Sequence, residues 1–244
     1  MSLEFPKISP IGERGILVEF EPEISPEVLQ KVLFFKNKIE NYCIKEKVEV
    51  INTYNSLLIS YPYTIENIDI AFSDIKTLFE GTNIPKLATL QTYYLPVCYH
   101  TQFAPDLNLL AQENNLEIEE IIEYHSSVFY DLYFIGFLPG FLYLGGLDKK
   151  LTISRKKTPR KSVPKGSVGI GENQTGIYPK SSPGGWQIIG RCPVDLFNKN
   201  QVPPSPFKAG SKVKFYPVSK DEFHQIEDEV DRGVFQIKTE IYEG

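Results

Sequence analysis

The sequence predicts an α+β domain of residues 1–88 followed by a mainly-β domain of residues 89–244. Two observations support this division. In the first part of the chain, strand-like segments alternate with segments whose apolar residues recur every three or four positions, as in helices. From Tyr130 onward, glycine, proline, aromatic and β-branched residues predominate and turns recur, which is typical of all-β structure. A chain of 244 residues is long enough for two domains of modest size.

The N-terminal elements follow the order strand, helix, strand, strand, helix. Residues 15–20 (GILVEF) form a predicted strand, and residues 26–41 place apolar side chains at helical spacing. The elements predicted after these are strands at 48–51 and 56–61, a helix at 65–79 and a last strand at 89–97. This order is the split βαβ pattern of a small α+β sandwich. Pro85 interrupts the pattern, so we place the domain boundary near residues 85–92.

The predicted C-terminal domain opens with two short helices, at residues 106–113 and 117–127. Frequent turn signals then separate short strands, and residues 234–242 (VFQIKTEIY) alternate like a final strand. Neither internal repeats nor low-complexity segments occur. We therefore expect mainly β structure from residue 130 onward.

Charge is unevenly distributed along the chain. A net charge of −5 and an isoelectric point near 5.4 argue against nucleic acid as the main partner, because neutralising phosphates requires a basic surface. Residues 87–148 contain no Lys or Arg, whereas residues 149–165 contain eight of them and no acidic residue. The second segment is therefore a candidate for binding an anion.

The sequence predicts a soluble cytoplasmic protein without a membrane partner. No apolar segment approaches the roughly 18 to 20 residues that cross a bilayer, and the first residues do not resemble an export signal. Cys43, Cys98 and Cys192 are odd in number, widely spaced and in no CxxC pair, so they fit neither a disulfide framework nor a zinc site. We expect three free thiols and no bound metal.

Several catalytic motifs are absent from the sequence. It contains no GxxxxGK[ST], GxSxG or HExxH, and no GxGxxG after a strand, so we expect neither a standard nucleotide-binding loop nor a standard hydrolytic nucleophile. The chain is therefore not expected to hydrolyse ATP alone. Its only methionine is Met1, so the usual Met-Lys context of a biotinylated lysine does not occur, and we expect no biotin attached to this chain.

Ten of the 17 glycines lie in three stretches, at residues 134–148 (FIGFLPGFLYLGGLD), 158–170 (TPRKSVPKGSVGI) and 173–193 (NQTGIYPKSSPGGWQIIGRCP). Glycine permits positive φ and close backbone approach, so such a density indicates either tight β turns or backbone amides presented to a ligand. Spacing alone leaves both alternatives open.

These three stretches resemble the signature of the family that groups the B subunit of 5-oxoprolinase, allophanate hydrolase subunit 1 and the sporulation inhibitor KipI, a carboxyltransferase-domain family. The sequence departs from the family pattern at Lys165, at Gly171-Glu172 and at Ser154-Arg155. The resemblance implies an N-terminal ferredoxin-like domain and a C-terminal cyclophilin-like β barrel that works beside a second, homologous subunit.

The function that the resemblance implies first is that of one component of an ATP-dependent 5-oxoprolinase. Such a complex hydrolyses 5-oxo-L-proline to L-glutamate with release of ADP and phosphate. The implied partners are a homologous carboxyltransferase-domain subunit and a third oxoprolinase subunit, without which the chain would be inactive. ATP would bind at a site shared with a partner.

Two other functions share the same motifs. The chain resembles half of a biotin-dependent carboxyltransferase acting on urea or a related amide, and avidin sensitivity would separate that activity from the first. It also resembles a KipI-like inhibitor of a sporulation histidine kinase, which has no catalytic duty. The sequence leaves both alternatives open.

The family pattern and residue chemistry together point to seven candidate site residues. The predicted catalytic residues are His125, Gln174 and Tyr178, and the predicted substrate- or phosphate-binding residues are Arg160, Arg191, Gln187 and Trp186.

Each candidate residue has a structural alternative. His125 lies on the apolar face of the predicted helix 117–127, so it is either a packed side chain or a proton-transfer group. Gln174 could cap a turn, and Trp186 could belong to the core instead of forming the floor of a site. For Arg160 and Arg191 the alternative to bidentate recognition of an anion is solvation at the surface.

Overall fold

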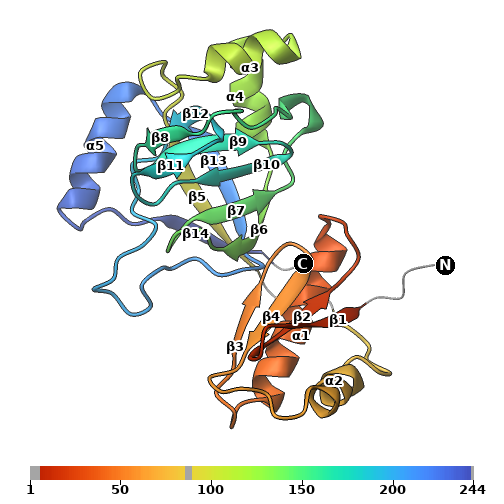
Figure 1. The fold of residues 1–244 in the computed structure, drawn as a ribbon. Coiled ribbons are helices and arrows are strands. Elements are labelled where there is room, and N and C mark those ends of the chain that lie inside the picture. Colours follow the sequence, from red (N-terminus) through yellow and green to blue (C-terminus); the bar gives the residue numbers. More distant parts are fainter. Residues whose placement is uncertain (1–5, 86–89, 243–244) are drawn as a thin grey trace. The chain divides into compact units, whose positions relative to one another are not determined.

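The computed structural model describes residues 6–85 and 90–242, and the chain divides into two compact units, Met1–Ala88 and Thr89–Gly244 (Figure 1). The first unit is a four-stranded antiparallel sheet in the order β1-β2-β4-β3, packed against two helices. Its elements are β1 (Lys7–Ile11), β2 (Gly15–Glu19), α1 (Pro26–Tyr42), β3 (Glu49–Asn52), β4 (Ser56–Ser60) and α2 (Ile68–Thr77).

One face of this sheet is apolar and forms the core of the first unit. Ile16 and Val18 of β2 and Leu57 and Ile59 of β4 are fully buried, as the alternation of side chains along a strand requires. Helix α1 covers this face with apolar residues at helical spacing, and the side chain of Ser25 caps its N-terminus. The helices predicted at 26–41 and 65–79 are confirmed.

The last strand predicted for the first unit belongs to the second. Strand β5 (Leu90–Val97) pairs with β13 (Lys212–Pro217) and β14 (Lys238–Tyr242). The edge position beside β2 is taken by β1, which the sequence did not predict. A tight hairpin around Gly12, whose φ is +60°, brings β1 back onto β2, so this pairing is local in sequence.

The second unit is built on an eight-stranded sheet in the order β12-β9-β10-β7-β6-β13-β5-β14. The two short helices predicted before it are present as α3 and α4. Apart from β5, β13 and β14, its elements are α3 (Leu107–Asn114), α4 (Ile118–Ser127), β6 (Tyr130–Ile135), β7 (Leu142–Gly145), the 3-10 turn η1 (Lys149–Leu151), β8 (Arg160–Val163), β9 (Ser167–Gly171), β10 (Gln174–Ile177), β11 (Ser182–Gly184), β12 (Gln187–Arg191) and α5 (Lys220–Asp231).

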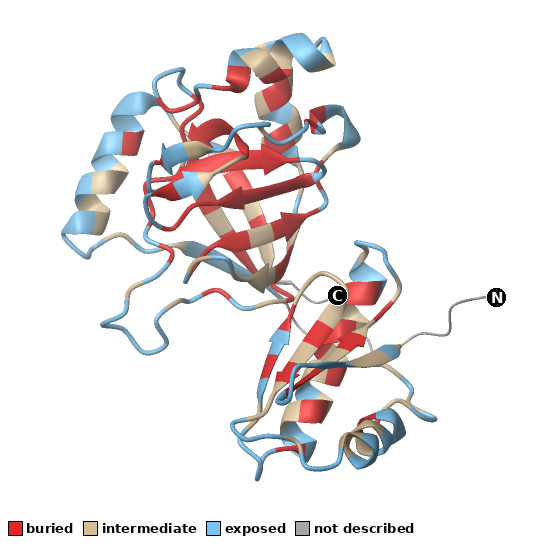
Figure 2. Cartoon of the chain, in the orientation of Figure 1, coloured by how far each residue is buried: buried red, intermediate tan, exposed pale blue. Residues whose placement is uncertain are grey.

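The large sheet curls around the core of the second unit. Cys98, directly after β5, and Arg191, at the end of β12, exchange two backbone hydrogen bonds of 2.9 and 3.0 Å. This bridge brings the first strand of the sheet order close to the last but one. Figure 2 shows the strands of this unit as the most continuously buried part of the chain, with Leu95, Leu132 and Ile170 among its fully buried residues.

Helix α5 was not predicted, because mainly β structure was expected after residue 130. The segment is strongly polar and buries a single residue, Phe223, against Phe103. A capping box starts the helix: the Ser219 side chain accepts the N–H of Glu222, and the Glu222 side chain accepts the N–H of Ser219. The sequence SKDE carries that signal, so the start of this helix could have been recognised from the residues.

None of the helices formed by the described residues combines the length and the apolar character that spanning a lipid bilayer requires.

Candidate functional site

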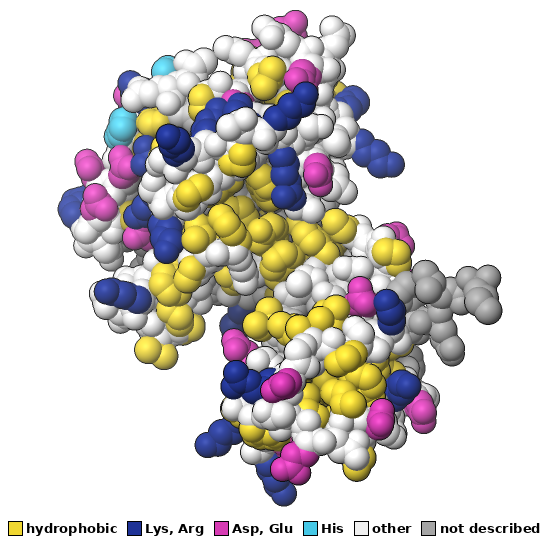
Figure 3. Space-filling model, viewed as in Figure 1, with side chains coloured by type: hydrophobic (Ala, Val, Ile, Leu, Met, Phe, Trp, Pro, Cys, Tyr) yellow, Lys and Arg dark blue, Asp and Glu magenta, His cyan; other side chains and the backbone are white. Residues whose placement is uncertain are grey.

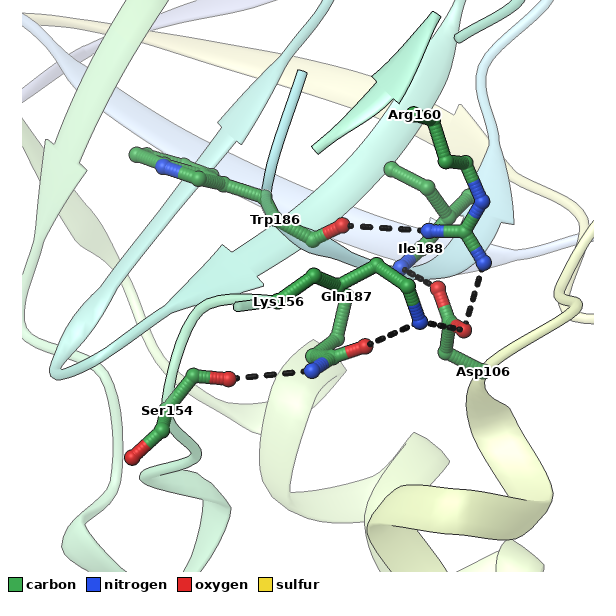
Figure 4. A network of polar contacts seen from close by, with 7 residues as sticks. All are labelled: Asp106, Ser154, Lys156, Arg160, Trp186, Gln187 and Ile188. Carbon is green, nitrogen blue, oxygen red and sulfur yellow. Dashed lines mark hydrogen bonds and ion pairs between the residues drawn. The ribbon is translucent and has the colours of Figure 1, made fainter. Parts of the chain in front are cut away.

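A buried aspartate, Asp106, joins three segments of the second unit (Figure 4). Its Oδ1 accepts a hydrogen bond of 2.6 Å from Arg160 Nη2 and one of 3.2 Å from Lys156 Nζ. Its Oδ2 accepts the backbone N–H of Ile188 at 2.6 Å. One carboxylate at the start of α3 therefore fixes the beginning of β8, the backbone of β12 and the loop that carries Lys156.

The donors around Asp106 keep its carboxylate ionised. Only 5% of the side chain is exposed, and this burial by itself raises the pKa of the carboxyl group. The Arg160 guanidinium, the Ile188 amide and the Lys156 ammonium act in the opposite direction, and together they bring the pKa of Asp106 below its usual value of 3.8. The site thus holds one permanent negative charge against two cations at neutral pH.

Gln187 extends the network from Asp106 toward the chain at Ser154. Its Oε1 accepts a hydrogen bond of 3.3 Å from Lys156 Nζ, and its Nε2 donates to the Ser154 carbonyl at 3.0 Å. Arg160 also donates to the carbonyl oxygen of Trp186, at 3.5 Å. Three of the predicted binding residues, Arg160, Gln187 and Trp186, therefore lie together.

Asp106 is a site residue that the sequence analysis missed. It stands at the N-cap position of a helix predicted from residue 106, where aspartate is common. In the structure its side chain makes no cap hydrogen bond and is used instead on β8 and β12. A capping aspartate and a site aspartate have the same local sequence pattern, so no local signal would have separated them.

An aromatic cavity of about 480 Å³ lies beside the network. The rings of Phe141 and Tyr143 contact the Trp186 indole edge to face, with ring centroids 5.5 and 5.9 Å apart. Tyr178 and Pro159 contribute further apolar wall. The cavity falls within the size range of small-molecule sites, and its lining is largely aromatic.

Two glycines let the Trp186 indole lie directly on the sheet. A Cβ at Gly171 would stand 2.6 Å from Trp186 Nε1, and a Cβ at Gly176 would stand 3.1 Å from Trp186 Cζ3. A side chain at Gly171 would displace the ring, and one at Gly176 would crowd it. At these two positions, glycine is therefore needed so that the Trp186 ring can pack closely against the sheet.

The border of the aromatic cavity carries two cations, Arg155 and Lys156. Arg155 lies over the Trp186 ring, with 5.8 Å from its Cζ to the ring centroid. Arg155, Lys156 and Lys157 also line an adjoining hollow of about 370 Å³. In the view of Figure 3, hydrophobic side chains gather over β7 and β10 of the second unit, and Lys and Arg side chains surround them.

Phe137 stands at the border of the cavity in a strained conformation. Its φ is +65°, a region that favours glycine, and 62% of its surface is exposed. Its ring contacts Phe141 edge to face at 5.7 Å. An exposed aromatic side chain held in this conformation at the border of a cavity is typical of ligand contact surfaces.

His125 lies inside the core of the second unit and has no exposed surface. Its Nδ1 is 2.7 Å from the Tyr99 hydroxyl, and its Nε2 is 3.0 Å from Thr175 Oγ1. The ring stacks on Phe215 at 4.8 Å. Burial lowers the pKa of His125 to about 3, so the imidazole is neutral and is not placed to contact a substrate.

Gln174 and Tyr178 are both buried, and only Tyr178 lines the aromatic cavity. Gln174 alternates with Thr175 along β10 and therefore faces the side on which Trp186 packs. Its Oε1 is buried and has no hydrogen-bond partner among the described residues. Tyr178 lines the cavity, and burial raises the pKa of its hydroxyl, so the phenol keeps its proton at neutral pH.

Arg191 lies apart from the network, although the sequence grouped it with Arg160. Its Nε donates to the Lys165 carbonyl at 2.9 Å, and its Nη2 is 3.9 Å from Glu227 Oε1 on α5. The guanidinium also lies over the rings of Phe103 and Phe223, 5.6 Å from each centroid. These contacts connect α5 to the end of β12. Part of the environment of Arg191 is therefore formed by a helix that the sequence analysis did not predict.

The sequence matches the family described as carboxyltransferase domain, subdomain C and D, over residues 6–207. The chain belongs to this family. Among its relatives, the B subunit of 5-oxoprolinase from Bacillus subtilis is 36% identical over 237 residues, which cover 91% of the chain and 97% of the relative. The protein of the same name from Haemophilus influenzae is also 36% identical, and the match covers 85% of the chain and 96% of that relative.

A larger protein of the family carries the same domain as one part. Urea amidolyase of Saccharomyces cerevisiae is 26% identical over 94% of the chain, but this match covers only 12% of the yeast protein.

Solved structures share the fold of the chain. TTHA0988 superposes with a TM-score of 0.72 at 26% identity, covering 84% of the chain and 40% of that structure. The urea carboxylase of Kluyveromyces lactis superposes with a TM-score of 0.82 over 96% of the chain and 24% of that structure; at 21% identity this likeness shows a shared fold.

Proposed function

We propose that the chain is one component of an ATP-dependent 5-oxoprolinase that acts only together with partner subunits. Identity of 36% over nearly the whole length of the 5-oxoprolinase B subunits from two bacteria supports this function. The proposed partners are a homologous carboxyltransferase-domain subunit and a third subunit. The proposed setting is the cytoplasm.

The geometric observation that carries the proposal is the aromatic cavity with cations at its border. 5-Oxoproline is a small five-membered lactam with one carboxylate, so it offers an apolar ring and one negative charge. The Trp186 floor suits the ring, and Arg155 and Lys156 suit the charge. The hydroxyl of Tyr178, which lines the cavity and keeps its proton at neutral pH, suits a polar atom of the lactam.

In the proposed reaction ATP is a second substrate. One water adds across the C–N bond of the lactam, which breaks to give the carboxylate and amine of glutamate, and a second water is consumed as ATP becomes ADP and phosphate. The residues of this chain would hold the lactam ring, exclude water from its apolar face and offset negative charge. ATP would bind at a site shared with a partner.

The proposal extends to the two domains. We assign the first unit a ferredoxin-like arrangement in which β1 takes the edge position of the usual last strand, and the second a cyclophilin-like barrel. The antiparallel order β1-β2-β4-β3 and the backbone bridge between Cys98 and Arg191 support these assignments. The site residues proposed for binding lie in the second domain.

The test is release of ADP that depends on 5-oxoproline, measured with the chain alone, with its partner subunits, and with avidin added. Turnover is expected only in the complete mixture and is expected to be insensitive to avidin. A complex that is shown to be assembled and still releases no ADP would contradict the proposal.

A second function, half of a biotin-dependent carboxyltransferase acting on urea or a related amide, is favoured by the match to urea amidolyase over 94% of the chain. The avidin arm of the same experiment decides between them. Turnover that avidin abolishes, with urea as the better substrate, would replace the oxoprolinase assignment.

A further inference from the structure

The cations around Asp106 outnumber the negative charges that the network offers them. The carboxylate receives three donors, from Arg160, Lys156 and the Ile188 amide. Arg160 and Ile188 make the two shorter contacts, at 2.6 Å each, and they occupy different oxygens. Asp106 would therefore stay ionised and hydrogen-bonded if Lys156 turned away from it, so such a movement leaves no buried charge without a partner.

Lys156 is the donor best able to turn. Its contacts with Asp106 and Gln187, at 3.2 and 3.3 Å, are longer than the 2.6 Å contacts that Arg160 and the Ile188 amide make with Asp106. A lysine ammonium carries three N–H donors on a flexible stem, so it can keep one of these acceptors and still donate to a ligand. Its side chain is 27% exposed, and Lys156 lines the aromatic cavity, whereas Asp106 does not.

Arg155 is the other cation at the cavity, and it is less well fixed. Its side chain is 48% exposed, and its ion pair with Glu172 is long, at 3.8 Å between Nε and Oε1. Such exposed pairs are screened by water and contribute little. The Lys156 ammonium starts instead from a position defined by two acceptors that are themselves buried.

From this geometry we infer that Lys156 binds the carboxylate of the ligand in the aromatic cavity and so makes the site specific for anionic rings. Asp106 and Arg160 are positioning residues: Arg160 holds Asp106, and Asp106 holds Lys156 at the cavity until a ligand arrives. The inference rests on the proposed function for the identity of the ring, and it deepens that function by assigning its charge recognition to one side chain.

The test compares Lys156→Met with Lys157→Met in the assembled complex. Lys157 is the next residue, is exposed and lines the adjoining hollow but not the aromatic cavity, so it is a matched control. Two quantities are measured: KM for 5-oxoproline and the inhibition constant of 2-pyrrolidinone, the same ring without a carboxylate. Lys156→Met is expected to raise KM about 10- to 150-fold, the loss of one hydrogen bond to a charged group of about 1.5–3 kcal/mol.

A charge-specific role has a signature that a merely structural role lacks. The inhibition constant of 2-pyrrolidinone should stay within about twofold in Lys156→Met, and Lys156→Arg should recover part of the lost affinity for 5-oxoproline. Equal losses for both ring compounds, an unchanged KM, or the same loss in Lys157→Met would overturn the inference. The inference would also be overturned if Arg155→Met, and not Lys156→Met, abolished the preference for 5-oxoproline over 2-pyrrolidinone.

The inference and the proposed function fail in different ways. If the wild-type complex turns over 5-oxoproline and Lys156→Met discriminates as well as wild type, only the inference fails. If the wild-type complex shows no turnover, the proposed function fails first, and fluorescence of the purified chain decides the inference. Trp186 is its only tryptophan and lies in the cavity, so 5-oxoproline should change its emission in wild type and not in Lys156→Met; no change in wild type overturns the inference.

Discussion

His125 is a neutral imidazole enclosed by the core of the second unit. Acid therefore favours the unfolded chain, in which this histidine can take up a proton. In the unfolded chain an ordinary histidine takes up a proton near pH 6.5, whereas in the fold the pKa of His125 lies at about 3. Between these values the unfolded state binds more protons. The free energy of unfolding therefore has its full value, as far as His125 is concerned, above pH 6.5, and it decreases as the pH falls from 6.5 toward 3.

A glutamine at position 125 should flatten this pH dependence. Between pH 6 and pH 4 the free energy of unfolding of wild type should include a loss of about 1.4 kcal/mol per pH unit that His125→Gln lacks. Urea unfolding at several pH values measures the slopes. His224→Gln is the control for replacing a histidine at the surface, because His224 is exposed on α5. Equal slopes in wild type and His125→Gln would contradict the assignment.

Single residues were predicted from the sequence with uneven success, for a physical reason. His125 was placed correctly on an apolar helix face, but only the tertiary structure shows that Tyr99 and Thr175 engage both ring nitrogens. Asp106 and Arg160 are 54 positions apart, so no local pattern relates them. Chemistry and family pattern indicated candidate residues, whereas the pairs they form depend on contacts that are distant in sequence.

Strand β10 has a glycine, Gly176, at a position where the neighbouring atoms leave no room for a side chain. A Cβ at Gly176 would stand 2.5 Å from the Leu142 carbonyl oxygen on β7, which is backbone and cannot turn aside. Gly176→Ala should therefore lower the free energy of unfolding by about 1–3 kcal/mol, as overpacking of a core does. Gly185→Ala is the control, since its nearest neighbour would be 3.7 Å away. Thermal unfolding of both variants tests this, and equal stabilities would refute it.

At the level of whole elements, the spacing of apolar residues predicted elements with a broad buried face well and mostly exposed elements poorly. Helix α1 buries six residues at helical spacing, which makes the pattern strong. Strand β1 is a mostly exposed edge with Pro10 in it, and α5 buries only Phe223, so neither leaves a clear apolar pattern. Strand β5 was found at the right place in the chain, but its partners, β13 and β14, lie more than a hundred residues away.

The residues that the structure describes form two large cores that share no residue, one in each unit. Leu57→Ala should destabilise the first unit by about 2–5 kcal/mol, and Leu132→Ala should do the same to the second, because both side chains are fully buried. Hydrogen exchange measured segment by segment should show faster exchange in the altered unit alone. Ile44→Ala, at a residue that is 71% exposed, serves as control. Uniformly faster exchange throughout the chain would show a single cooperative unit instead.

The position of Asp106 also bears on when the site comes into existence during folding. Its carboxylate bonds to the amide of Ile188, 82 positions further along the chain, and to Arg160 between them. Closing loops of this length is entropically costly and slow compared with forming a helix. A chain emerging from the ribosome therefore has α3 and α4 available long before it has a place for Lys156, and ligand recognition in this protein is acquired late in synthesis, when β12 has joined the sheet.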